Sequence, residues 1–289
     1  MLGRPSFLIA CTATVAVTAA APASGAVRVT TSVEYGTAQV RAPEARSAPL
    51  LLDLYRPAER TRRARPVVIL IHGGGFRHQS RKDAALVRVA RGLAARGIAA
   101  ATIDYRLIPQ EPVPSARVAP LLEAMPEAPI STGAATAVDD TLTAIRFLRR
   151  RASSLQVDVR RLGLVGGSAG AVTAAHVAYV LDDHGIEAPK VRFVGSLWGG
   201  IIVPPGARQL DRGEAALFAA HGTADTTVPI RLGDELVARA RDQRVRTEYH
   251  RLRGGGHGFR RSGFFTAKVA GDQTAFDRLL RFASARLRR

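Results

Sequence analysis

The chain has 289 residues, a formal net charge of +18 and 42 basic residues, of which all but three are arginine. The arginines are spread along the chain without a recognition motif, which argues against nucleic acid as a partner. The positive charge reflects either solvated arginine faces or attraction to an acidic surface, and the sequence leaves both open. The single cysteine, Cys11, would leave with a cleaved amino-terminal segment, which excludes a cysteine nucleophile from the mature chain.

Residues 1–26 have the pattern of an export signal. Arg4 supplies a positive charge, residues 6–21 carry no charge, and small residues fill positions 23–26. The pattern predicts cleavage after Ala26 and a secreted or periplasmic protein. The apolar run is shorter than the roughly 20 residues of a membrane-spanning helix, so we expect no stable membrane insertion after cleavage. A lipoprotein cut before Cys11 would leave too few apolar residues ahead of it, which argues against a lipid anchor.

From residue 66 onward, apolar runs alternate with helical patterns, which predicts βα units and a mainly parallel, twisted sheet. The expected parallel strands cover 67–71, 98–103, 162–166, 191–197, 217–221 and 247–252. Two earlier strands, over 28–35 and 50–55, would add an antiparallel edge. Helices are expected over 81–96, 135–151, 169–184, 231–241 and 272–286. The chain is therefore predicted to be one α/β domain over 27–289, with an eight-stranded sheet and helices on both faces.

Residues 108–132 break this alternation between an expected strand and the helix that should follow it. The segment is rich in proline and weakly patterned. Long connections of this kind are either functional or loose. Two interpretations stay open: a small cap over an acyl pocket, with Leu121, Leu122 and Met125 turned inward, or a surface excursion that contacts no substrate.

A run of three glycines, Gly73, Gly74 and Gly75, follows the apolar run 67–71 and lies between His72 and Phe76. Three consecutive glycines favour a loop with unusual dihedral angles, which can turn successive N–H groups toward one point. An acyl-transfer enzyme needs such donors where negative charge develops. A glycine hairpin or a phosphate-binding turn is the alternative, although no lysine follows in Walker spacing and no GxGxxG is present.

The pentapeptide Gly166-Gly167-Ser168-Ala169-Gly170 follows the apolar run 162–165 and opens an alanine-rich stretch. This context of strand, sharp turn and helix is one in which a serine hydroxyl can be exposed at the carboxyl edge of a sheet. Gly166 and Gly170 would let strand and helix approach closely, and the N–H of Ala169 would face a reacting oxygen. An ordinary glycine-rich βα turn is the alternative for the pentapeptide alone.

An acid and a base that could serve such a serine lie downstream. Asp225 comes just after the expected strand 217–221, and His257 lies in a glycine-rich loop after the expected strand 247–252. Ser, Asp, His is the chain order of α/β-hydrolases. Asp211 and Asp234 are alternatives for the acid, but neither follows a strand directly.

Other histidines are weaker candidates for the base. His221 lies at a strand end beside Asp225 and reads as structural, and His250 falls inside a strand pattern. His72 is expected to brace the glycine loop. The seven histidines show no metal-ligand spacing such as HExxH, so no metal site is predicted.

Two further groups follow expected strands. The stretch Asp104-Tyr105-Arg106 is expected to brace the glycine loop through an ion pair or hydrogen bonds rather than to react. Trp198, the only tryptophan, would either wall a pocket or fill the core.

Taken in order, these motifs resemble the α/β-hydrolases of the carboxylesterase type with an HGGG oxyanion loop, similar to hormone-sensitive-lipase-like esterases and bacterial acetyl or feruloyl esterases. The resemblance covers roughly residues 50–260 and implies the α/β-hydrolase fold. It implies Ser168 as nucleophile, His257 as base and Asp225 as the acid that orients it, with Gly74, Gly75 and Ala169 as the oxyanion hole.

The expected activity is hydrolysis of short-chain acyl esters, such as acetyl or feruloyl groups on a small molecule or a polysaccharide, through an acyl-enzyme. No metal or organic cofactor is required for this chemistry. An amide or peptide hydrolase, or a non-catalytic ligand-binding protein of the same fold, stays open as the alternative.

Overall fold

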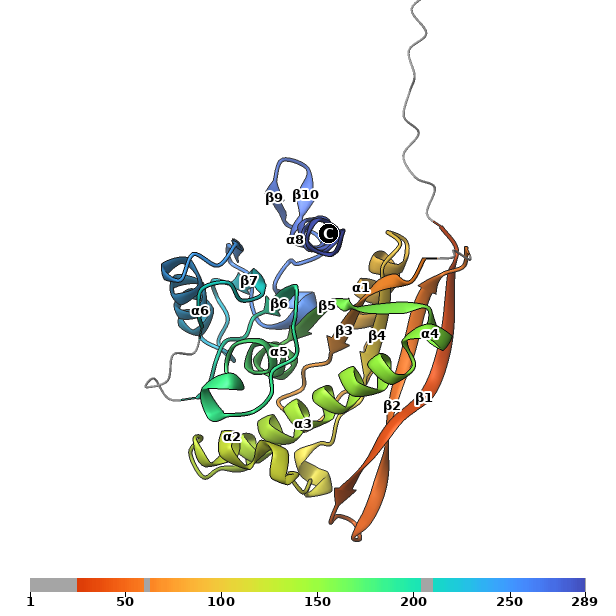
Figure 1. Cartoon of the computed structure of the whole chain (residues 1–289). Helices are drawn as coiled ribbons and strands as arrows, with labels where there is room; N and C mark the ends of the chain where they lie inside the picture. Colours follow the sequence, from red (N-terminus) through yellow and green to blue (C-terminus); the bar gives the residue numbers. More distant parts are fainter. Residues whose placement is uncertain (1–24, 60–62, 204–209, 289) are drawn as a thin grey trace, which may run out of the picture.

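The computed structural model describes residues 25–59, 63–203 and 210–288, so the predicted export signal lies almost entirely outside the described residues. Eight strands form one sheet in the order β1-β2-β4-β3-β5-β6-β7-β8 (Figure 1). The strands are β1 (Val27–Val40), β2 (Arg46–Pro57), β3 (Arg65–Ile71), β4 (Ala99–Ile103), β5 (Val157–Gly167), β6 (Phe193–Leu197), β7 (Ala216–Gly222) and β8 (Thr247–Leu252). Strands β3 to β8 are parallel, and β1 and β2 form the expected antiparallel edge.

Helices cover both faces of the sheet, as predicted (Figure 1). The α-helices are α1 (Ala84–Ala94), α2 (Ala119–Glu123), α3 (Pro129–Arg150), α4 (Ala152–Leu155), α5 (Ala169–Tyr179), α6 (Ile230–Asp242), α7 (Gly258–Arg261) and α8 (Ala275–Leu287). Short 3-10 turns lie at η1 (Ile108–Gln110), η2 (Ala116–Val118) and η3 (Asp182–His184), and a small hairpin pairs β9 (Lys268–Ala270) with β10 (Gln273–Thr274). The α/β-hydrolase arrangement expected from the motifs is the one observed.

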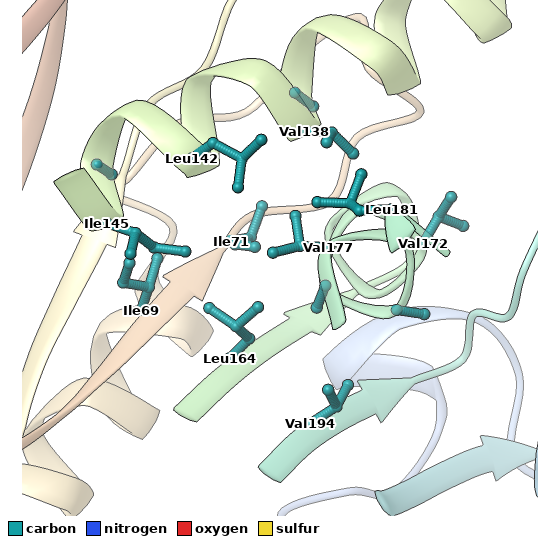
Figure 2. Packing of buried hydrophobic residues seen from close by; sticks show 14 of the residues in the cluster. Ile69, Ile71, Val138, Leu142, Ile145, Leu164, Val172, Val177, Leu181 and Val194 are labelled. Carbon is teal, nitrogen blue, oxygen red and sulfur yellow. The ribbon is translucent and has the colours of Figure 1, made fainter. Parts of the chain in front are cut away.

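The two faces of the sheet carry separate hydrophobic clusters. In β3, Ile69 and Ile71 point toward α3 and α5, whereas Val68 and Leu70 point toward α1 and α8. Figure 2 shows Val138 and Leu142 of α3 packed with Val177 of α5 over the first face. Because both faces are buried, the central strands have unbroken apolar sequences instead of alternating ones.

Element boundaries differ from the sequence prediction where polar residues continue an element. Strand β5 begins at Val157, before the apolar run that starts at Leu162, because a register shift opposite Pro66 and Val67 lets polar residues join the ladder. Helix α3 begins at Pro129, ahead of the expected start at 135, and proline is tolerated there because the first turn has no intrahelical N–H bond to lose.

The segment 108–132 is not a loose excursion. It contains η1, η2, α2 and the first turn of α3, and Val118, Leu121 and Met125 are buried in the cluster under α3. Leu122 is half-buried against the same cluster. These side chains pack into the core under α3, and a role of the segment as a cap over an acyl pocket stays a prediction.

Candidate active site

Ser168 lies at a sharp turn between β5 and α5. Its backbone has φ of 55° and ψ of −122°, a conformation that residues other than glycine rarely adopt. A Cβ on Gly166 would lie 2.1 Å from the Gly170 carbonyl oxygen, and a Cβ on Gly170 would lie 2.1 Å from the Ile71 carbonyl oxygen. The backbone segments therefore approach too closely here for any residue but glycine. The Ser168 N–H donates to the Leu197 carbonyl at 2.9 Å, which ties the turn to β6. The serine is held at the carboxyl edge of the sheet.

His257 bridges Ser168 and Asp225. Its Nε2 lies 3.0 Å from Ser168 Oγ, and its Nδ1 lies 2.8 Å from Asp225 Oδ2. The three residues follow β5, β7 and β8, whose carboxyl ends meet at one edge of the sheet. Because the carboxylate can only accept, Nδ1 carries the proton and Nε2 is left to accept from the serine hydroxyl.

Asp225 is fixed as a charged acceptor. Its Oδ1 accepts the N–H groups of Thr227 and Val228, both at 2.9 Å. Burial raises the pKa of the Asp225 carboxyl, but these donors and the imidazole of His257 outweigh burial, and the net pKa is lowered. The carboxylate therefore stays ionised at neutral pH and can stabilise an imidazolium at His257.

The glycine loop faces the serine. The ideal Cβ position of Gly73 is 3.3 Å from Ser168 Cβ, and Gly74 and Gly75 have φ of +90° and +60°. The N–H groups of Gly74, Gly75 and Ala169 have no hydrogen-bond acceptor within the described chain. These amides are therefore free to serve as the predicted oxyanion donors, and that role stays a prediction.

Tyr105 and His72 brace this loop, as the sequence predicted. The Tyr105 hydroxyl donates to the carbonyls of His72 and Gly73 at 3.1 and 3.0 Å, and the two rings stack with centroids 4.2 Å apart. Burial lowers the pKa of His72, which keeps its imidazole neutral. His72 Nδ1 also lies 2.9 Å from the Gly73 carbonyl. The loop is thus held through hydrogen bonds to its carbonyl oxygens, and its N–H groups remain available to a ligand.

Three comparisons with known proteins agree with this geometry. A family model described as BD-FAE matches residues 52–118 and 130–196. The structure of Thermogutta terrifontis esterase 2 phosphoramylated by tabun superposes with a TM-score of 0.63 at 22% identity, over 91% of this chain and 94% of that one. A truncated carbohydrate esterase from gut microbiota gives a TM-score of 0.64 at 18% identity, over 91% and 97%. The chain therefore has the α/β-hydrolase fold.

Curated relatives of this hydrolase are much longer proteins. The non-reducing polyketide synthase pkbA of Emericella nidulans is 30% identical over 146 residues, which are 50% of this chain and 5% of that synthase. The 5-methylorsellinic acid synthase of Aspergillus terreus is 29% identical over 143 residues, 49% of this chain and 5% of that synthase. This chain therefore corresponds to a small part of each relative's length.

The BD-FAE match includes the glycine loop and the serine turn of the hydrolase but ends before Asp225 and His257. Their assignment rests on the hydrogen bonds to each other and to Ser168. The structure thus brings together all three residues that the sequence singled out, and their catalytic roles stay predictions.

The alternative acids and bases lie in other contacts. His221 Nε2 lies 2.9 Å from the Val228 carbonyl and 3.4 Å from Asp225 Oδ2, and burial lowers the pKa of this imidazole. His250 pairs with Glu248 at 2.8 Å, and Asp234 accepts the Tyr249 hydroxyl at 2.8 Å. Asp211 donates its backbone N–H to Glu214 at 2.8 Å. None of these contacts joins the described side chains to Ser168.

Trp198 fills the core beneath the site. It is buried, its indole packs on Gly167, and its ring meets Phe259 edge-on with centroids 4.7 Å apart. Since α7, which carries Phe259, follows His257 directly, this contact supports the loop that holds the imidazole. The pocket-wall alternative for Trp198 is not what the packing shows.

Sequence reasoning expected an ion pair or hydrogen bonds from the stretch Asp104 to Arg106 but missed the partners. Arg81 contacts Asp53 at 2.9 Å and also pairs with Asp104. Arg106 contacts Asp139 and Asp140 of α3 at 3.0 and 2.7 Å. The signal that could have found the second group is the adjacent pair Asp139-Asp140, the only acidic residues of α3.

Within the described ranges, no group of three or more histidine, cysteine, aspartate or glutamate side chains is arranged to hold a metal ion. In the same residues, no helix is both long and apolar enough to cross a membrane.

Proposed function

We propose that this hydrolase is an exported serine carboxylesterase that cleaves short-chain acyl esters, with Ser168 as nucleophile. The proposal depends on one observation: His257 links Ser168 Oγ to Asp225 beside three amides without acceptors. Export outside the cytoplasm is proposed from the amino-terminal sequence alone.

Each atom has a defined task in the proposed reaction. His257 Nε2 takes the proton of the Ser168 hydroxyl as Oγ attacks the ester carbonyl. The charge that develops on the carbonyl oxygen is met by the N–H groups of Gly74, Gly75 and Ala169. His257 then gives its proton to the leaving alcohol, which leaves an acyl group on Ser168. Water, deprotonated by the same imidazole, releases the acid and restores the serine.

Short acyl groups are proposed because structurally similar esterases bind them. Structures of Thermogutta terrifontis esterase 2 have propionate and butyrate bound, and each is 22% or 23% identical to this chain. The carbohydrate esterase from gut microbiota makes a saccharide-linked ester a reasonable natural substrate class. Acetyl and feruloyl esters fit the same proposal.

Turnover of p-nitrophenyl acetate, butyrate and longer esters tests the proposal. Ser168→Ala is expected to lower kcat by about 10⁴- to 10⁶-fold. Asp225→Asn should lower it by about 10⁴-fold, because the amide would hold the imidazole in the wrong tautomer, with the proton on Nε2. Ser153→Ala, at an exposed serine of α4, is the matched control and should turn over ester like the parent chain. Ester turnover that survives Ser168→Ala would falsify the assignment.

Covalent labelling separates chemistry from binding. The relative Thermogutta terrifontis esterase 2 has been captured phosphorylated by paraoxon. Paraoxon should add one diethyl phosphoryl group to this chain, which peptide mass spectrometry should locate at Ser168 and which Ser168→Ala should lose. A chain that binds p-nitrophenyl esters without turnover or labelling would support the non-catalytic alternative.

A further inference from the structure

The edge of the sheet opposite the proposed active site is lined by arginines. Ser168, Asp225 and His257 lie beyond the carboxyl ends of β5, β7 and β8. At the amino ends of the parallel strands lie Arg65 in β3, Arg160 and Arg161 in β5, and Arg192 before β6. Antiparallel β2 ends here with Arg56, and β1 starts here with Arg28. We call these six arginines the basic edge.

Hydrogen bonds connect the arginines of the basic edge into one continuous surface. Arg56 donates to the Leu155 carbonyl at 3.2 Å, and Arg65 to the Gly97 carbonyl at 3.5 Å. Arg161 donates to the carbonyls of Ala64 and Leu287 at 2.8 and 3.4 Å. Arg192 donates to the Arg160 carbonyl at 3.2 Å. These guanidinium groups therefore bind backbone carbonyls of segments that are far apart in the sequence.

The charges of the basic edge are largely uncompensated. Within the described chain, Asp158 is the only carboxylate that pairs with any of the six, through Arg160 and Arg161 at 3.1 and 3.0 Å. At the other edge, by contrast, Arg81 and Arg106 are paired with buried carboxylates. Hydrogen bonds to carbonyls fix the guanidinium groups without neutralising them, so the edge carries a local positive potential.

Neighbouring positive charges extend this surface. The last turn of α3 and the residue after it supply arginines at 149–151, all exposed. The Leu155 N–H donates to the Arg151 carbonyl at 2.9 Å, and Arg56 contacts the same Leu155, so the run adjoins the basic edge.

We propose that the basic edge docks on an anionic lipid bilayer surface and leaves the active site facing away from the membrane. Guanidinium forks match phosphate oxygens in paired hydrogen bonds, and each basic residue near an anionic membrane strengthens binding. Among the described residues, the only exposed large hydrophobic side chain is Ile130, so this edge has no aromatic platform for stacking sugars or bases. That absence favours a headgroup surface over a polysaccharide or a nucleic acid.

Vesicle sedimentation tests the proposal. The probes are vesicles of ether-linked phosphatidylcholine with and without ether-linked phosphatidylglycerol, since ether lipids cannot be hydrolysed by an esterase. The protein should bind only the phosphatidylglycerol vesicles, and binding should weaken as salt rises. The variant R28Q/R160Q/R192Q, which neutralises the three exposed arginines of the basic edge, should partition about 10- to 100-fold more weakly.

The matched control removes the same charge from the other end of the sheet. Arg41 and Arg46 flank the β1–β2 turn, Arg253 follows β8, and all three are exposed. R41Q/R46Q/R253Q should bind vesicles like the parent chain. An equal loss in both variants would mean that diffuse charge, not this edge, drives binding, and would overturn the proposal. Tighter binding to polygalacturonate or duplex DNA than to the vesicles would overturn it as well.

Ester hydrolysis by the vesicle-bound protein tests which edge of the sheet faces the membrane. Vesicle-bound protein should hydrolyse p-nitrophenyl acetate as fast as free protein, because the proposed site lies at the opposite edge. Binding that blocks turnover would contradict this orientation. If the free protein hydrolyses no ester, the proposed function fails, while the partition of the two variants still decides the docking surface.

Discussion

At the scale of single residues, the site depends on side chains and backbone held against their own preferences. Ser168 keeps a positive φ that costs on the order of 1–3 kcal/mol. The backbone is packed so closely at Gly166 and Gly170 that a Cβ at either position would overlap a neighbouring carbonyl. The strain is therefore held by the packing of β5 against α5, and it exposes the hydroxyl to His257.

His176 is a second residue held at a cost, and it lies about two helical turns along α5 from the serine. It is wholly buried, its Nδ1 lies 2.6 Å from the Val172 carbonyl, and its Nε2 has no hydrogen-bond partner in the described chain. Burial lowers the pKa of His176 to about 4. An unfolded histidine has a pKa of about 6.5, so between about pH 4 and pH 6.5 the unfolded state binds more protons at this residue than the folded state does.

His176 should therefore make the fold acid-sensitive. Its contribution to stability is complete above about pH 6.5 and is lost as pH falls toward 4, by at most about 3 kcal/mol. His176→Leu should flatten the decline of unfolding free energy between pH 7 and 5, measured by urea denaturation. Part of the slope should remain, since burial also lowers the pKa of His72 and His221. His78→Gln, at an exposed histidine, is the control; an unchanged slope in His176→Leu would contradict the prediction.

At the scale of elements, the glycine loop places two glycines in different surroundings. A Cβ on Gly74 would lie 2.1 Å from the His78 carbonyl, whereas one on Gly75 would meet nothing within 4 Å. Both have positive φ, so either substitution adds backbone strain on the order of 1 kcal/mol. Only the first also forces the loop backbone to move.

Alanine substitutions should separate the two positions. Gly74→Ala should lower kcat for p-nitrophenyl butyrate by about 10²- to 10³-fold, the effect of losing an oxyanion donor, with a smaller change in KM. Gly75→Ala should keep most of the activity, because its amide can stay in place. The two variants are matched controls for each other, and equal losses would show that the space around Gly74 does not govern the loop.

The same elements show what the sequence could predict. Buried central strands have unbroken apolar runs, so β3 and β7 were located to within a few residues. The edge strand β8 has a mixed sequence but was also located, and the residues that follow β7 and β8 gave Asp225 and His257. The start of α3 and the polar half of β5 were missed because tertiary pairing, not local pattern, extends them. The pairing of Arg81 with Asp53 joins residues whose proximity depends on the whole sheet, which no local spacing encodes.

At the scale of the whole molecule, the arginines at the two edges of the sheet differ in their partners. Buried arginines at the active-site edge pair with carboxylates, whereas the basic edge leaves guanidinium groups near one another. Burial lowers the pKa of Arg56, and the charge of Arg28 lowers it further. The folded chain therefore carries repulsion that its buried ion pairs do not cancel.

Salt should accordingly stabilise the fold. Raising sodium chloride from about 10 to 150 mM shortens the screening length from about 30 to 8 Å, which weakens repulsion among exposed arginines more than attraction in the buried pairs of Arg81 and Arg106. The urea midpoint should rise by the equivalent of about 1 kcal/mol. Arg28→Gln should raise the midpoint at low salt and reduce its salt dependence, because Arg56 loses a repulsive neighbour. A midpoint that falls with salt would show that ion pairs, rather than repulsion, dominate the net electrostatics of a chain with charge +18.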